Sequence, residues 1–155
     1  MKHFFGSILI CTLFVTLKVF GQEQVNIVNK LNNISNGLTN HSHDLMDYEL
    51  PNENESVARD IIVEDINLIS FNVQSMLSKL DLFSLITSKK NRIKGKAIID
   101  SDIENAYKLI DFVITETNQK LSSSKNIAIL QNGNEVIKLF RDTKEIYGQI
   151  QSTFK

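Results

Sequence analysis

The chain has 155 residues, of which 42% are hydrophobic and 23% are charged. Two of its 17 basic residues and none of its 18 acidic residues lie within the first 21, so the remaining 134 residues carry a net charge of −3 and give no reason to expect nucleic-acid binding. The single cysteine also lies within those first residues. The rest of the chain must therefore fold by apolar packing, without a disulfide bond.

Residues 1–21 have the features of a secretory signal peptide. A short basic start precedes an apolar run over residues 4–17, which has the length of a signal's hydrophobic region and is short for a bilayer span. Gly21 is the small residue expected before cleavage at Gln22. A retained membrane anchor is the alternative, which the shortness of the run disfavours. We expect a secreted or cell-envelope protein, with one domain over residues 22–155 and no transmembrane span after cleavage.

Two amphipathic helices are predicted for the first half of this domain, because apolar residues recur there at steps of three and four. The first spans about 16 residues. The second is longer, begins after Pro51 with Asn54 as its N-cap, and ends near the cations of residues 88–96. The predicted core positions are Ile27, Leu31, Ile34 and Leu38 in the first helix, and Ala58, Ile62, Ile66, Ile69, Val73, Met76, Leu80 and Phe83 in the second.

The second half predicts two further helices. A third helix is expected to begin at a capping box formed by Ser101 and Glu104. Residues 123–140 are ambiguous, because Asn132-Gly133 between two apolar runs is a β-hairpin signal, whereas a short helix that stops at Gly133 fits the helical spacing. We favour the helical corner, and hence an all-α fold: a bundle of four main helices with one additional short helix. Core positions are Ile103, Ala106, Ile110, Val113 and Leu121, then Val136, Phe140, Thr143, Tyr147, Ile150 and Phe154.

Residues 40–49, NHSHDLMDYE, contain the only histidines after the first 21 residues. By position they are expected to form a loop between the first two helices. His41 and His43 could share a metal with Asp44 only on an extended backbone, and no further histidine or thiol is present to complete a structural zinc site. We therefore favour a solvated loop and expect no metal and no cofactor.

Catalytic patterns are also missing from the sequence. It has no nucleophile elbow, no glycine-rich phosphate loop and no haem attachment motif. The carboxylate pair Glu64-Asp65 is expected on a solvated helix face, away from the apolar stripe. The sequence therefore predicts a protein that is not an enzyme.

Residues 88–96, SKKNRIKGK, carry five cations and could meet an anionic surface. We favour the alternative that these cations occupy the C-terminal end of the second helix and a solvated loop, where they complement the helix dipole.

The second helix carries another apolar stripe, opposite its core positions: Val57, Ile61, Leu68, Phe71, Leu82 and Ile86. Such a helix is either central in the bundle and covered on both sides, which is the structural expectation, or it lines a groove for something apolar. In the second case Leu68 and Phe71, together with Phe112 of the third helix, are the predicted ligand-binding residues.

Residues 102–150 have a capped helix, a short apolar segment leading to a glycine, and a last amphipathic helix, and residues 60–77 are of the same kind. In this pattern the chain resembles the secreted fungal hydrophobic surface-binding proteins and their cell-wall mannoprotein relatives. The resemblance implies adhesion to hydrophobic surfaces or lipid capture, without catalytic residues. The alternative is a cell-envelope module that self-associates through the same stripe. Three N-glycosylation tripeptides begin at Asn33, Asn40 and Asn54.

Overall fold

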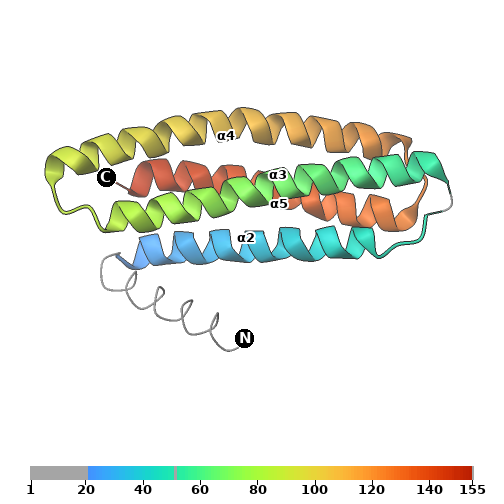
Figure 1. The fold of residues 1–155 in the computed structure, drawn as a ribbon, viewed down its shortest axis with the longest axis horizontal. Coiled ribbons are helices and arrows are strands. Elements are labelled where there is room, and N and C mark those ends of the chain that lie inside the picture. The colour runs from blue at the N-terminus through green and yellow to red at the C-terminus, as the bar shows by residue number, and fades with distance from the viewer. Residues whose placement is uncertain (1–20, 51, 155) are drawn as a thin grey trace.

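The computed structural model describes residues 21–50 and 52–154. They form four helices: α2 (Gln22–Met46), α3 (Glu53–Ser84), α4 (Lys89–Ser123) and α5 (Ile127–Thr153). Each helix runs antiparallel to the next along the chain, as Figure 1 shows. The predicted all-α bundle is confirmed. The predicted signal peptide lies outside the described residues, except for Gly21.

The four helices are arranged as a ring. α2 and α4 each pack against both α3 and α5, α3 and α5 approach each other across the core, and α2 and α4 make no close backbone contact. Every helix therefore turns one face inward and one face outward. The expectation that the second predicted helix is central was wrong, because α3 occupies one corner of the ring and its outer side is left uncovered.

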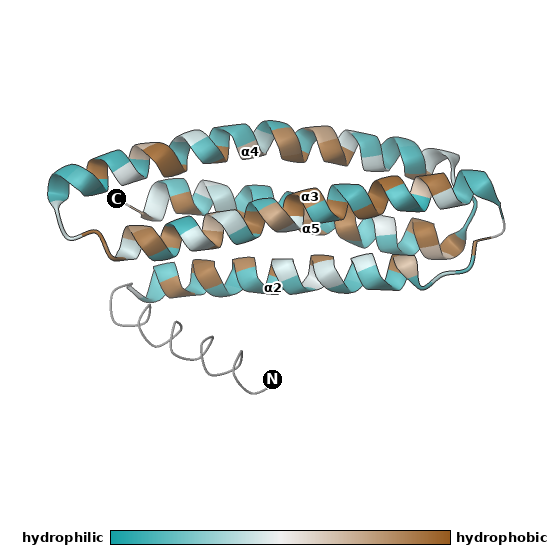
Figure 2. Cartoon of the chain, in the orientation of Figure 1, coloured by the Kyte–Doolittle hydropathy of each residue, from teal (hydrophilic) through white to brown (hydrophobic). Residues whose placement is uncertain are grey.

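The core consists of the stripes that the sequence predicts. Apolar and polar residues alternate along all four helices in Figure 2, and the apolar ones turned inward form one continuous cluster. All predicted core positions of the four helices are buried. The polar atom of the largest core side chain is satisfied, since the Tyr147 hydroxyl donates to Asn72 Oδ1 at 2.6 Å.

The first connection differs from its prediction. α2 continues through Met46, so residues 40–46 are helical and not a loop, because Leu45 keeps the inward spacing and is fully buried. The N-cap of α3 is Asn52, whose Oδ1 accepts the Glu55 N–H at 3.1 Å, and not Asn54.

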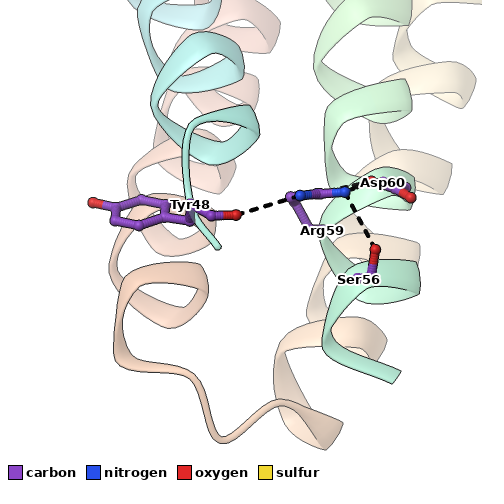
Figure 3. A network of polar contacts seen from close by, with 4 residues as sticks. All are labelled: Tyr48, Ser56, Arg59 and Asp60. Atoms are coloured by element: carbon purple, nitrogen blue, oxygen red, sulfur yellow. Dashed lines mark hydrogen bonds and ion pairs between the residues drawn. The ribbon is translucent and has the colours of Figure 1, made fainter. Parts of the chain in front are cut away.

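Arg59, on the second turn of α3, makes a polar contact with this connection. It donates to the carbonyl oxygen of Tyr48 at 3.5 Å and to Ser56 Oγ at 3.2 Å, and it pairs with Asp60 at 2.7 Å (Figure 3). The bond to Tyr48 joins the connection after α2 to the start of α3, whereas Ser56 and Asp60 lie on α3 itself.

The boundary between α3 and α4 was also predicted wrongly. α3 ends at Ser84 and α4 begins at Lys89, so the cations of residues 88–96 lie at a helix N-terminus instead of a C-terminus. Ser101 and Glu104 lie within α4 and form no N-terminal capping box. α4 starts this early because Ile99 is buried in the core, and because Gly95 packs against Phe83.

Gly133 does not stop a helix, because α5 runs through it without interruption. The segment forms neither the hairpin nor the separate short helix that we weighed. A Cβ at Gly133 would lie 2.4 Å from Leu121 Cδ2, so the glycine leaves room for this side chain of α4. Asn126 caps α5 by accepting the N–H groups of Ala128 at 2.9 Å and Ile129 at 3.2 Å.

Candidate functional site

The predicted ligand-binding residues are all exposed. Phe71 on α3 is 73% exposed, Phe112 on α4 is 60% exposed, and Leu68 on α3 is 44% exposed. Isolated exposed apolar residues are ordinary on a protein surface, whereas several that gather in one place indicate an interaction surface. Whether these three residues form an interaction surface therefore depends on how they lie relative to one another.

Two contacts between α3 and α4 fix the register of the helix pair. The Thr117 hydroxyl donates to Asp65 Oδ2 at 2.8 Å, and Lys79 Nζ lies 2.9 Å from Asp102 Oδ2. On α3, Leu68 and Phe71 lie between Asp65 and Lys79, and on α4, Phe112 lies between the two partners. The three apolar residues therefore share one level along the bundle axis.

They also share one side of the bundle. At about 100° per residue, Phe71 points away from the core, while Leu68 and Phe112 fall on the outer flanks of α3 and α4 that face each other. We call these three residues, Leu68, Phe71 and Phe112, the α3–α4 apolar face. Its members come from two consecutive helices, and Phe71 and Phe112 lie 41 residues apart in the sequence.

The remainder of the second stripe extends this surface along α3. Val57 and Leu82 are exposed, whereas Ile61 and Ile86 are half-buried. The stripe is thus uncovered over most of its length, since α3 has neighbours only on its inner side and flanks.

The environment of Asp65 on α3 also differs from its prediction. It was predicted to be solvated together with Glu64, but it is 4% exposed and accepts the Thr117 hydrogen bond. Burial raises its pKa from 3.8 to about 6, and the neighbouring Glu116 and Glu64 act in the same direction, against the Thr117 hydrogen bond. Its one polar partner is a threonine, so the contact joins two helices and offers no acid–base pair.

The histidines lie on α2. The Nδ1 atom of His41 lies 2.8 Å from Asn132 Oδ1 of α5, and His43 is exposed. Residues two apart on a helix diverge, so the two imidazoles cannot converge on one ion. Within residues 21–50 and 52–154, no group of three or more His, Cys, Asp or Glu side chains is placed to hold a metal.

A second exposed surface lies where α3 passes into α4, and our sequence reading missed most of it. Leu85, Ile93 and Ile98 are each more than half exposed there, next to the cations at the start of α4. The available signal was the interleaving of apolar residues with lysines after residue 88. It was overlooked because the run was assigned to a solvated helix end.

Comparisons with protein-family models, with curated proteins and with solved structures give no match. In the part of the chain that the structure describes, none of the helices is both long and apolar enough to cross a bilayer.

Proposed function

We propose that this is an exported, non-enzymatic binding protein that attaches to a lipid-like ligand or a hydrophobic surface through the α3–α4 apolar face. The observation that carries the proposal is the exposure of Leu68, Phe71 and Phe112 at one level of two adjacent helices. The core is complete without these residues, because the inner stripes of α3 and α4 are already buried.

The energetics support binding of an apolar partner. Fully burying a phenylalanine or leucine side chain contributes about 2 kcal/mol, and only the exposed part of each of these side chains remains to be buried. The three residues together therefore offer about 3.5 kcal/mol before the entropy cost of association is subtracted. The same residues contribute less to folding than the core residues do, since a large part of each side chain remains exposed to water. A surface of this kind favours reversible adhesion over tight capture of one small molecule.

The sequence supports the same proposal from another side. The N-terminal segment predicts export, and the pattern of residues 60–77 and 102–150 resembles proteins that bind hydrophobic surfaces. Export places the protein outside the cytoplasm, where such surfaces include lipid and cell-wall material.

The test compares two variants of the mature chain. Phe71→Gln with Phe112→Gln removes both aromatic rings, and Ile127→Gln, which alters an exposed residue at the start of α5, is the control. We expect the double variant to lose at least about tenfold in binding to octyl-coated beads and to phosphatidylcholine vesicles, while the control binds as the wild type does. Equal binding by all three proteins, with unchanged helical content, would refute the proposal.

The same variants examine the alternative of a self-associating envelope module, which would use the same face. Light scattering over a range of concentrations should find the wild type monomeric. A mass that rises with concentration in the wild type, but not in the double variant, would assign the face to self-assembly instead.

A further inference from the structure

The first turns of α4 project beyond the rest of the bundle. Measured from the Lys79–Asp102 ion pair, α3 ends after five residues, at Ser84, whereas α4 begins thirteen residues before the pair, at Lys89. Figure 1 shows α4 starting beyond the ends of α2, α3 and α5 on that side. This part of α4 is therefore a protruding corner.

The protruding turns are fixed to the bundle by packing. Gly95 lies close to Phe83 and Ile86, where a Cβ would come within 3.0 and 3.1 Å of their side chains. The Arg92 guanidinium lies 4.7 Å from the Phe83 ring centroid and donates to the Ile86 carbonyl at 3.2 Å. These contacts hold the first turns of α4 in place against the end of α3 and the turn that follows it.

The stretch of chain that forms the corner is rich in positive charge. Residues 82–99 contain five cations and no acid. Lys96 pairs with Asp100, whereas Lys89, Lys90 and Lys94 are exposed and have no carboxylate partner among the described residues. Because a helix N-terminus carries partial positive charge, cations there are unfavourable for the helix itself. The dipole of α4 therefore does not explain them.

Four apolar side chains accompany these lysines. Leu82, Leu85, Ile93 and Ile98 are each more than half exposed. Together with Lys89, Lys90 and Lys94 we call them the basic corner. At about 100° per residue, Lys90 and Lys94 lie between Ile93 and Ile98 around α4, so charged and aliphatic groups share one exposed surface without forming separate faces. An anionic headgroup layer offers partners to both kinds of group, since its phosphates attract lysines and its boundary with the acyl chains accepts aliphatic side chains.

We propose that the basic corner docks on the surface of an anionic lipid bilayer. The lysines meet the lipid phosphates and the aliphatic side chains enter the boundary with the acyl chains. A nucleic acid fits less well, because the net charge of the domain is negative and the corner offers aliphatic groups where bases would require aromatic or hydrogen-bonding ones. A protruding, convex corner also suits a flat surface.

This inference does not rest on the function proposed above, since the basic corner contains none of Leu68, Phe71 and Phe112 and its binding depends differently on lipid charge. Each lysine near an anionic membrane is expected to strengthen partitioning by about fivefold, so the three together contribute about 100-fold. The α3–α4 apolar face, in contrast, should bind neutral and anionic surfaces alike.

The experiment is sedimentation of the mature protein with vesicles of phosphatidylcholine alone, or of phosphatidylcholine mixed with phosphatidylserine. The charge variant carries Lys89→Gln, Lys90→Gln and Lys94→Gln, and the apolar variant carries Ile93→Gln and Ile98→Gln. A matched control removes three exposed lysines elsewhere: Lys108→Gln, Lys125→Gln and Lys138→Gln. Thermal unfolding followed by circular dichroism establishes that each variant folds.

We expect the wild type and the control to bind the mixed vesicles, and added salt to weaken this binding. The charge variant should bind the mixed vesicles up to about 100-fold more weakly, with its binding to phosphatidylcholine alone as the lower limit, and the apolar variant should bind them at least about tenfold more weakly within the same limit. Equal binding by the charge variant and the wild type would overturn the proposal, as would equal binding to both vesicle types. Retention on immobilised heparin without vesicle binding would also overturn it, by assigning the corner to soluble polyanions.

Discussion

Replacing Asp65 with asparagine tests how the α3–α4 interface responds to pH. The carboxylate is buried between the two helices and its pKa is raised to about 6, mainly by burial. Asparagine has nearly the same shape and keeps an oxygen that can accept the Thr117 hydrogen bond, which is 2.8 Å long in the native pair. The substitution therefore removes the charge and leaves the contact.

The sign of the effect follows from the direction of the shift. A carboxyl whose pKa is higher in the folded state than its ordinary value of 3.8 favours folding when it is protonated, and this contribution is lost as the pH rises through about 6. The shift corresponds to about 3 kcal/mol for a fully shielded group, and partial access of water reduces this to about 1–2 kcal/mol. The asparagine variant should therefore exceed the wild type in stability by about 1–2 kcal/mol near pH 8 and by about zero near pH 4.

The measurement is urea unfolding followed by circular dichroism at several pH values between these limits. Asp44→Asn, at an exposed position of α2, controls for the loss of one negative charge. A difference between Asp65→Asn and the wild type that does not vary with pH would refute the reasoning. A variant that is less stable than the wild type near pH 8 would show that the charge of Asp65 is favourable to the fold.

Three other predictions concern the contacts of single residues in the helices. Gly148→Ala should stabilise the protein by about 0.5–1 kcal/mol, because its new Cβ would lie 3.4 Å from the nearest atom outside α5. Gly133→Ala should destabilise it by about 1–2 kcal/mol, because its new Cβ would collide with Leu121 of α4. Equal gains in the free energy of unfolding in urea would contradict this prediction. Asn52→Ala should cost about 1 kcal/mol in the same assay, and Asn54→Ala should cost much less, because Asn52 is the N-cap of α3. Glu55 accepts hydrogen bonds from the side chain and backbone at the turn between α4 and α5, which hold its pKa below its ordinary value of 4.5. The contribution of Glu55 to stability should therefore be present above pH 4.5 and lost as the pH falls through the lower folded pKa. In the Glu55→Gln variant the free energy of unfolding should depend less on pH in this acidic range than it does in the wild type.

The buried stripes of the four helices were predictable, because helical periodicity reports directly which side of each helix is apolar. Every residue predicted for the core of α3, from Ala58 to Phe83, is buried. The outward position of Leu68, Phe71 and Phe112 follows from the same angular reasoning. Whether another helix covers them depends on how the helices are arranged around the core, which periodicity does not report.

The errors share one physical cause, which is tertiary packing that overrides local signals. Gly95 and Gly133 look like helix ends in sequence, but each lies within a helix at a close contact with a neighbour. The polar segment that contains His41 looks like a loop, yet it is helical because Leu45 reaches the core. The wrong end assigned to α3 then placed the cations of residues 88–96 where they would favour a helix.

The first turn of α2 and the last turn of α5 lie side by side. The Thr153 hydroxyl lies 3.2 Å from Glu23 Oε1, and Figure 1 shows both turns at the end of the bundle where α3 passes into α4. A carrier protein or bead attached at either terminus would therefore crowd the basic corner and reduce its access to a membrane. A circular permutant that joins Gly21 to Phe154 through a short linker and opens the chain at residues 47–50 would move both ends to the opposite end of the bundle. Such a permutant would leave the basic corner unobstructed for immobilisation experiments.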